Sequence, residues 1–418
     1  MPGFNQLIPL LTAAFILLAG NGIQGTLITL RANIEGFDST FIGLMGTAYF
    51  AGFALSCLAA PKMIRLVGHI RVFAALAAIA SAATLMLVLV VDGYVWMAMR
   101  FATGFCFAGL FTVMESWLAA TSKNTDRGKI LSIYRIVDMT ANAGAQFLLP
   151  AFGAMGFELF AIIAILFAIS LVPISLGDRS SPKPPESFSF DLRTVWTISP
   201  LACAGCLTLG LTNSAFRLIG PLYAETMGLD TAGVALFLSA GIVGGAALQF
   251  PLGYLSDRLD RRMMIIAATL GAMLAGLLLS TTEPGNAVMI YAGSFLFGAF
   301  ALPLYSLSIA HANDQAEPGQ YVLVAAGMIF FFAAGATFGP LIASLVLDRF
   351  GAPAFFSYTS AVHGALVVVT LVRMAIRPEV TDKGRSSFNY LLNSSPVFVR
   401  MATKKNSNYE KKTPKAPI

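Results

Sequence analysis

Long apolar runs alternate with short polar connections along most of the chain. Stretches such as 72–91 and 265–280 contain no charged residue, and a helix that crosses a bilayer needs about 20 mainly apolar residues. Strands of a membrane barrel alternate apolar and polar positions over about 10 residues, whereas these runs are apolar on every face. The pattern predicts an all-α membrane protein with twelve transmembrane helices, near residues 7–30, 40–61, 70–91, 93–119, 129–152, 155–177, 199–224, 231–254, 263–281, 286–310, 320–346 and 352–375.

The composition agrees with this pattern. Of 418 residues, 57% are hydrophobic and 11% are charged, whereas a soluble domain carries about 25% charged residues. All four cysteines lie inside apolar runs, and the C-x-x-C formed by Cys203 and Cys206 has no second Cys/His pair near it. We interpret the cysteines as packing residues in membrane helices and expect no metal site.

The basic residues are concentrated in alternate connections and in the C-terminal tail. One such connection holds Lys62, Arg65 and Arg71, while the opposite connections carry mostly Asp and Glu. Connections rich in Lys and Arg remain on the cytoplasmic side. This distribution predicts a multi-pass protein of the bacterial inner (plasma) membrane, with both termini in the cytoplasm.

The membrane region divides into two similar halves. A charged, Pro- and Ser-rich stretch begins at Asp178 and predicts an extended cytoplasmic linker. The predicted domains are an N-terminal six-helix bundle (1–177), the linker (178–198), a C-terminal six-helix bundle (199–376) and a basic, disordered cytoplasmic tail (377–418) attracted to anionic lipid.

An internal repeat supports this division. At one offset, 213 − 21 = 192, Asn21 matches Asn213 and Gly52 matches Gly244. The same offset joins Gly36 to Gly228 and Asp38 to Asp230. Parallel repeats of six helices occur in one large class of transporters, in which the substrate site lies at mid-membrane between the halves.

Two motifs carry a resemblance to a known family. The segment Gly253-Tyr-Leu-Ser-Asp-Arg-Leu-Asp-Arg-Arg262 resembles the G-x-L-x-D-R-x-G-R-R loop of the major facilitator superfamily (MFS), with Asp260 in place of the second glycine. Arg100-Phe-Ala-Thr-Gly104 resembles the R-x-x-x-G element of that superfamily, and residues 40–150 are most similar to its YcaD-like subgroup. The resemblance implies two pseudo-symmetric bundles (the MFS fold) and secondary active transport by alternating access.

The resemblance also implies a cytoplasmic gate. In the first half the corresponding loop keeps Gly68 and a final basic residue, but Arg65 stands where the family has Asp, which places the acid-based latch of that half in doubt. The expected gate residues are Gly253, Asp257, Arg258, Arg261 and Arg262 in the second half, and Arg65, Gly68 and Arg71 in the first.

Charged residues inside predicted spans are candidates for coupling transport to protons. A charge at the centre of a membrane helix costs roughly 2.5–3.5 kcal/mol on insertion scales. Asp138 lies near mid-membrane and could load and release a proton, or Arg135 could hold it ionised. Glu115 could be a second proton site or a structural partner of Arg135 or Arg127, and Arg100 has the same two alternatives.

Other polar residues predict a substrate site. Arg217 follows Asn213 by one helical turn, and an arginine in a cavity binds carboxylate or phosphate through paired hydrogen bonds. Similar polar faces occur on the first and fifth predicted helices. The predicted substrate-binding residues are Asn21, Gln24, Asn142, Gln146, Asn213 and Arg217.

These residues favour a proton-coupled carrier of a small organic solute, such as an anionic metabolite, working as a monomer. The chain has no phosphate-binding G-x-x-x-x-G-K-[ST] loop and no catalytic constellation, so we expect no enzyme activity, no cofactor and no nucleic-acid partner. A multidrug/proton antiporter remains the alternative, favoured by 33 phenylalanines. A sensor or scaffold of the same fold that does not transport is a further alternative.

Overall fold

The computed structural model describes residues 7–121, 127–176, 191–317 and 320–376, and the secondary structure of these ranges is helical. The first half contains α1 (Ile8–Ile34), α2 (Ser39–Val67), α3 (His69–Leu89), α4 (Gly93–Thr121), α5 (Arg127–Ala145), α6 (Leu148–Phe152), α7 (Glu158–Ile169) and α8 (Leu171–Leu176). After α9 (Leu192–Ile198), the second half contains α10 (Pro200–Leu218), α11 (Gly220–Thr226), α12 (Thr231–Ser256), α13 (Arg261–Ser280), α14 (Ala287–Ala301), α15 (Leu304–Gln315), α16 (Tyr321–Phe350) and α17 (Ala352–Ile376).

Most of these helices are long and apolar enough to cross a membrane. Ten helical stretches of the described ranges meet that criterion, and the bent pair α9–α10 makes up to eleven. The remaining span is α5 with its short continuation α6, and α5 is shorter and more polar because it carries Arg135, Asp138 and Asn142. It packs between α1 and α12. The predicted arrangement of six helices in each half is therefore confirmed.

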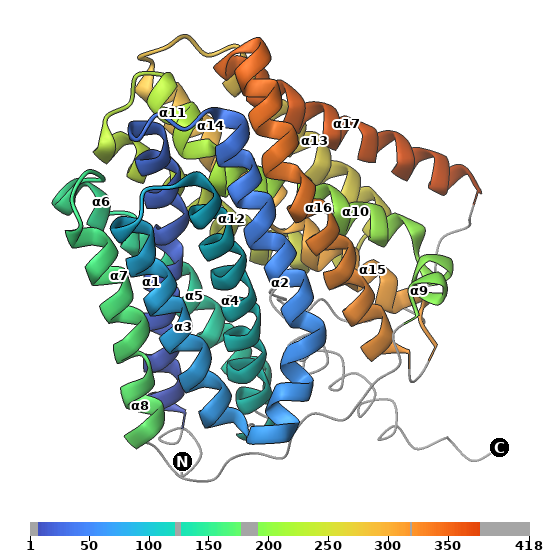
Figure 1. Cartoon of the computed structure of the whole chain (residues 1–418). Coiled ribbons are helices and arrows are strands. Elements are labelled where there is room, and N and C mark those ends of the chain that lie inside the picture. The colour runs from blue at the N-terminus through green and yellow to red at the C-terminus, as the bar shows by residue number, and fades with distance from the viewer. Residues whose placement is uncertain (1–6, 122–126, 177–190, 318–319, 377–418) are drawn as a thin grey trace.

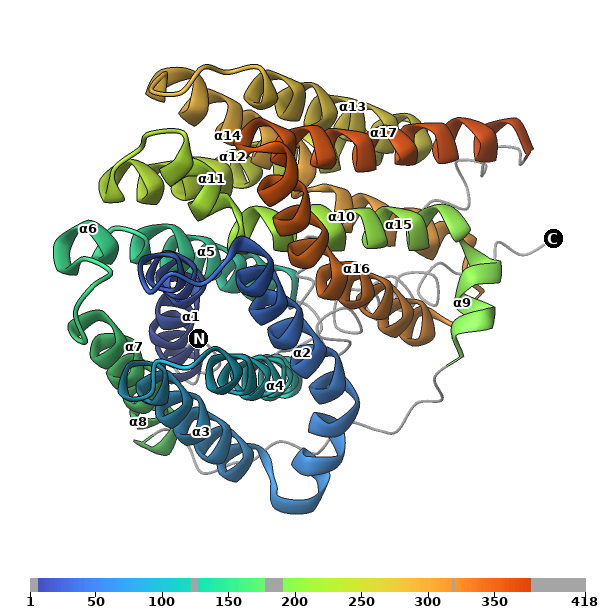
Figure 2. The ribbon, with the colours of Figure 1, turned by 45° about the horizontal axis from the view of Figure 1, so that its top comes forward.

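The two halves form separate bundles that lie side by side. Helices α2 and α16 run next to each other between the halves (Figure 1), and Figure 2 shows α1–α8 on one side of the molecule and α10–α17 on the other. The turned view of Figure 2 shows α4 nearly end-on while α10 and α17 run across the picture, so the bundles are inclined to each other. A second contact between the halves joins α5 to α12.

The internal repeat appears in the backbone as well. Gly36 and Gly228 both adopt a positive φ, of 82° and 87°, which glycine adopts without steric strain. Two residues later, Asp38 and Asp230 each cap the next helix, accepting a hydrogen bond from a backbone N–H three residues on. The correspondence read from the sequence is therefore structural.

Glycines bring α2 and α4 into close contact. A Cβ atom at Gly52 would overlap the carbonyl oxygen of Phe101, and one at Gly104 would overlap that of Tyr49. Gly244 in α12 faces α14 in the same way, against the carbonyl oxygen of Phe295. Small residues let membrane helices approach closely, and this contact fixes the relative position of the two helices that carry Tyr49 and Arg100.

We expect Gly104→Ala to destabilise the protein strongly, because the added methyl group would meet backbone rather than a movable side chain. Gly144→Ala in α5 is the matched control, since a Cβ atom there meets no atom within 4 Å. Thermal unfolding of both purified variants measures the effect. Equal melting temperatures would show that the α2–α4 contact relaxes without penalty.

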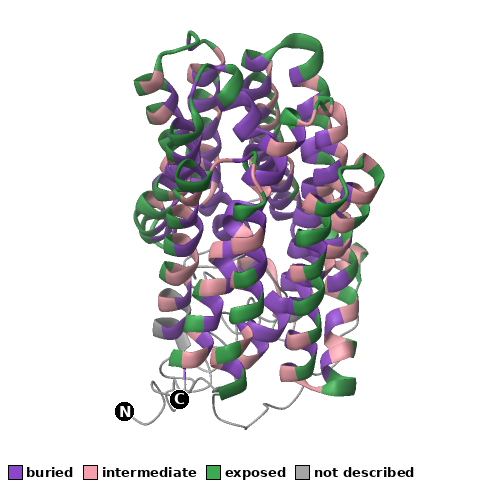
Figure 3. Cartoon of the chain, turned by 60° about the vertical axis from the view of Figure 1, so that its left-hand side comes forward, coloured by how far each residue is buried: buried purple, intermediate pink, exposed green. Residues whose placement is uncertain are grey.

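The outer surface is apolar, as expected for contact with lipid. Leu274 is 60% exposed and Val368 is 60% exposed. Figure 3 shows buried positions on the helix faces that point into each bundle, and exposed positions on the outer faces and at the ends.

The last part of the predicted linker (178–198) is helical. Residues 192–198 form α9, because the carboxylate of Asp191 accepts hydrogen bonds from the backbone N–H groups of Arg193 and Thr194. The chain then bends by 108° into α10. The Pro-rich part of the linker (178–190) and the basic tail (377–418) lie outside the described residues.

Candidate functional site

Contacts between the halves lie at the end of the molecule that holds the turn between α1 and α2. Thr47 in α2 donates to the carbonyl oxygen of Thr337 in α16 (2.7 Å). Asn33 donates to Glu225 (3.0 Å). Asn33 and Glu225 are 192 residues apart, so they occupy equivalent positions in the two repeats. Toward the opposite end of the molecule the ribbons of the two halves diverge (Figure 1).

A cavity of about 1420 Å³, counting the space at its open mouth, lies between the halves. Seven of the residues singled out from the sequence line it, from α1, α4 and α5 in the first half and α10 in the second. They are Asn21, Arg100, Arg135, Asp138, Asn142, Asn213 and Arg217.

A chain of hydrogen bonds crosses the cavity from one half to the other. Arg135 forms an ion pair with Asp138 (3.1 Å). The amide nitrogen of Asn142 donates to the carboxylate of Asp138 (2.9 Å), and its amide oxygen accepts from Arg217 (2.9 Å). The charge of Asp138 is thus connected to an arginine of the second half through one asparagine.

The guanidinium of Arg217 is exposed to the cavity, and within the described ranges it forms no ion pair. Arg100 is 2% exposed and lies over the ring of Tyr49, 4.4 Å from the ring centroid. The hydroxyl of Tyr49 in turn donates to Asn21 (3.2 Å). Cations over an aromatic face are attracted to it, but such a contact satisfies no guanidinium N–H.

Two of the predicted substrate-binding residues lie outside the cavity lining. Gln24 is fully buried and donates to Thr84 in α3 (2.8 Å). Gln146 donates to the carbonyl oxygen of Gly22 (2.8 Å) and accepts from Thr26 (2.9 Å). Both side chains therefore hold α1 against its neighbours in the first bundle.

Glu115 is also fully buried and lies behind the lining, in α4. Arg135, one partner expected for it, pairs with Asp138 instead. The side chain of Arg127, the other partner considered, lies outside the described residues. Glu115 is close enough to Tyr134 and Tyr305 for its charge to act on both, and these two residues do line the cavity.

The phenylalanines of the lining were not among the substrate-binding residues predicted from the sequence, whereas Tyr49 and Tyr305 were weaker candidates. Phenylalanines are common in membrane helices, so no single one stood out. Their spacing offered only a weak signal, since Tyr49 and Phe53 are one turn apart on α2. The lining includes Phe50, Phe53, Phe111, Tyr134, Phe216, Tyr305 and Phe332.

The predicted gate residues of the second half contact one another. Arg261, which is 2% exposed, bonds to Asp314 (2.6 Å) and Asp257 (3.3 Å). Arg262 pairs with Asp260 (2.8 Å). Burial alone would raise the pKa of the Asp260 carboxyl, but the hydrogen bonds and charge of Arg262 outweigh burial and hold that pKa below its usual value.

The remaining gate residues make no ion pair across the halves within the described ranges. In the second half, Arg258 lies over the ring of Tyr254, 4.1 Å from its centroid, next to the buried Gly253. In the first half, Arg65 and Arg71 are exposed, and Gly68 ends α2 with a φ of 86°.

Comparison with known proteins identifies the family. The model of the Major Facilitator Superfamily matches residues 10–246 and 203–402. The chain belongs to this superfamily, whose members are membrane transporters that bind small-molecule substrates and are not enzymes. The curated relatives described below are bacterial, and the chain is a bacterial multi-pass membrane protein.

Three relatives show how far the similarity extends. An uncharacterized MFS-type transporter of Enterobacter sp. (strain 638) is 25% identical over 388 residues, which cover 90% of this chain and 98% of the relative. A Yersinia pestis (strain Pestoides F) protein of the same description is 24% identical over 84% of this chain and 91% of its own. The MFS-type transporter YcaD of Escherichia fergusonii is 21% identical over 87% of this chain and 94% of its own.

Solved structures confirm the fold. The nucleoside transporter NupG has a TM-score of 0.76 at 12% identity, covering 88% of this chain and 99% of its own. A bacterial homologue of the human lysosomal transporter Spinster has a TM-score of 0.68 at 15% identity, covering 99% of this chain and 100% of its own. The human organic anion transporter MFSD10 has a TM-score of 0.60 at 14% identity, covering 88% of this chain and 100% of its own. At these identities the likeness concerns the fold alone.

Proposed function

We propose that this protein is a proton-coupled secondary transporter of small organic anions that works by alternating access. The charge of the cavity carries the proposal. Three arginines and one aspartate line it, so that 3 − 1 gives an excess of two positive charges. Arg217 is the anchor for the anion, because it is exposed to the cavity and Asn142 fixes its orientation. Asn21 and Asn213, which also line the cavity, add neutral hydrogen-bonding groups for the rest of the substrate.

Asp138 is the proposed proton site. It lines the cavity and is held between Arg135 and Asn142. When Asp138 is ionised it neutralises one arginine, and when it is protonated it leaves that arginine free to attract an anion. Loading a proton at Asp138 therefore favours loading of an anionic substrate at Arg217, and this is the linkage that cotransport requires.

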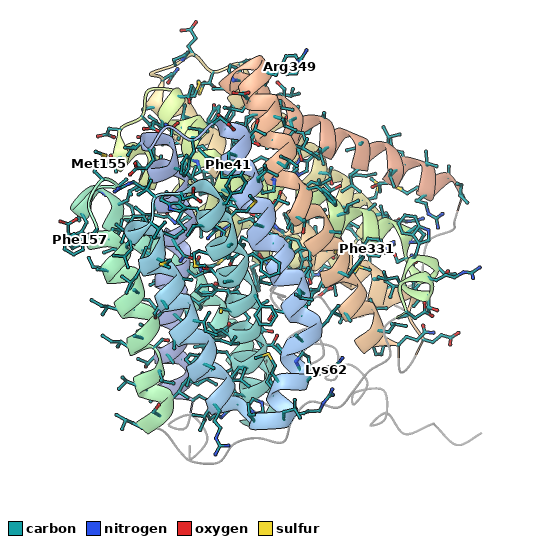
Figure 4. All side chains as sticks on the ribbon, in the orientation of Figure 1. Phe41, Lys62, Met155, Phe157, Phe331 and Arg349 are labelled. Carbon is teal, nitrogen blue, oxygen red and sulfur yellow. The ribbon has the colours of Figure 1, made fainter. Side chains whose placement is uncertain are left out.

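The proposed orientation places the diverging end of the halves in the cytoplasm, with both termini. Lys62, near the end of α2, lies on this side of the molecule. Arg349, near the end of α16, lies on the opposite side (Figure 4). The conformation is then inward-facing. Closure of the gate would break the ion pairs of Arg261 and Arg262 within the second half. Their acidic partners could then pair with Arg65 and Arg71 of the first half.

Transport by purified protein in liposomes tests the proposal. We expect uptake of radiolabelled butyrate, succinate or benzoate to exceed that of empty liposomes, and to rise when the outside is made more acidic. Uptake of none of the three would exclude the function, whereas binding of an anion without uptake would favour a sensor.

The aromatic lining favours a second candidate, an exporter of lipophilic cations. The same liposomes can be loaded with tetraphenylphosphonium. Export of that cation driven by a proton gradient, with no uptake of the anions, would replace the anion proposal by this one.

A further inference from the structure

The cavity has a cationic part and an aromatic part. Arg100, Arg217 and Asn142 belong to the first. In the second, Phe53 of α2 packs against Phe111 of α4, with ring centroids 6.3 Å apart. Tyr305 and Phe332 of the second half also pair, at 6.0 Å.

The two parts are separated along the helix axes. Phe111 follows Arg100 by 111 − 100 = 11 residues on α4, or about 16 Å at the rise of an α-helix. On α10, which runs in the opposite direction, Leu209 precedes Arg217 by 217 − 209 = 8 residues, or about 12 Å. The guanidinium groups of Arg100 and Arg217 therefore lie nearer the end where the halves meet, and the ring of Phe111 lies nearer the end where they diverge.

Arg100 has hydrogen-bonding capacity that the protein does not use. A guanidinium offers five N–H donors, and within the described ranges Arg100 makes neither an ion pair nor a hydrogen bond. Its contact is the face of Tyr49. A buried charge without a partner is unfavourable, and Arg100 belongs to the lining of the cavity, with 2% of the residue exposed.

Arg100 and Arg217 act on the same region from different halves. The phenol of Tyr49 lies within electrostatic reach of both guanidinium groups. Arg100 is fixed by the close packing of α4 on α2, where Gly104 meets the backbone of Tyr49. One anionic group placed beside Tyr49 could therefore be attracted by both arginines.

We infer that the substrate is an elongated amphipathic carboxylate, whose anionic group lies between Arg100 and Arg217 and whose aromatic or apolar body packs against Phe53, Phe111 and Phe332. The inference rests on the proposed transport of organic anions and narrows its substrate class. It gives Arg100 a direct part in binding, in place of the coupling role predicted from the sequence. Because each arginine belongs to a different half, the bound anion joins the halves.

Binding of phenylbutyrate, butyrate and the neutral phenylbutyramide to the purified wild-type protein tests the substrate class. Ligand-induced rises in melting temperature report binding to the folded state. We expect phenylbutyrate to bind at least tenfold more tightly than butyrate, because only phenylbutyrate reaches the aromatic part. Phenylbutyramide should bind at least tenfold more weakly than phenylbutyrate, because it carries no charge for the arginines.

Two pairs of variants test the residues. Arg100→Gln should weaken phenylbutyrate at least tenfold, while Arg349→Gln, at the outer end of α16 (Figure 4), should leave its affinity unchanged. Phe111→Leu should reduce the preference for phenylbutyrate over butyrate severalfold. Phe157→Leu, which removes a ring that is 63% exposed, should not. Melting temperatures without ligand identify a variant that fails to fold. If a variant does not fold, the binding of the three ligands to the wild-type protein tests the inference instead.

The outcomes separate this inference from the proposed function. If butyrate and phenylbutyrate bind equally well, the protein remains an anion transporter but the elongated substrate is excluded. If Arg100→Gln folds and binds phenylbutyrate like Arg349→Gln, Arg100 has no part in holding the anion. If no anion in either series binds or is transported, the proposed function itself fails.

Discussion

Arg217→Gln is expected to weaken the binding of organic anions by more than tenfold. Arg217 is exposed to the cavity, and Asn142 holds one of its nitrogens at 2.9 Å, leaving other N–H groups for a ligand. Hydrogen bonds to charged groups contribute about 1.5–3 kcal/mol, and a tenfold change in affinity corresponds to about 1.4 kcal/mol. Glutamine keeps a hydrogen-bond donor but loses the charge and the paired geometry.

Titration calorimetry with phenylbutyrate or benzoate measures this change. Arg217→Lys keeps the charge without the planar fork and should lie between wild type and Arg217→Gln. Arg349→Gln removes an arginine from the exposed end of α16 and is the matched control. Wild-type affinity in Arg217→Gln would remove this residue from the substrate site, and a loss in both glutamine variants would indicate a general effect of charge.

Asp138→Asn is expected to abolish the response of transport to a pH gradient while binding of the anion persists. Asparagine has nearly the same shape and can keep the bond from Asn142, but it cannot take up or release a proton in this range. It also leaves Arg135 without its ion pair, which raises the positive charge of the cavity. Anion affinity should therefore stay the same or increase.

Two transport modes in the same liposomes separate coupling from binding. Uptake driven by an imposed pH gradient should be lost in Asp138→Asn, while exchange of internal for external substrate at equal pH should continue. Asp348→Asn, at the exposed end of α16, controls for the loss of an acid. Full gradient-driven accumulation by Asp138→Asn would place the proton site elsewhere, with Glu115 the next candidate because it is buried in α4.

Three expectations that rest on composition and chain order are confirmed: the membrane spans, the internal repeat and the family resemblance. Apolar length predicts the spans because a bilayer requires it, whatever the neighbouring helices are. The offset of 192 residues predicts the repeat, and the equivalent turns at Gly36 and Gly228 confirm it. The R-x-x-x-G and loop motifs indicate the superfamily, to which the chain belongs.

The predictions that depend on which helices pack together were less accurate. Gln24 and Gln146 are polar and lie at helical positions that a cavity face would use. Both nevertheless form hydrogen bonds within the first bundle. Asn21 and Asn142, each about one turn away from one of them, do line the cavity. A helical pattern tells which residues share a face, but not whether that face meets another helix or open space.

The sequence by itself determined that the chain spans a membrane with two similar bundles and that a few charged residues lie within them. Those properties follow from the free energy of transferring each residue from water to the bilayer, which depends on the residue type and not on its neighbours in the fold. Only the tertiary structure decided that Arg135 pairs with Asp138, that Arg217 reaches Asn142 across the two halves, and that aromatic rings form one part of the cavity. These contacts depend on how the bundles pack and incline, because that packing sets which faces of distant helices meet.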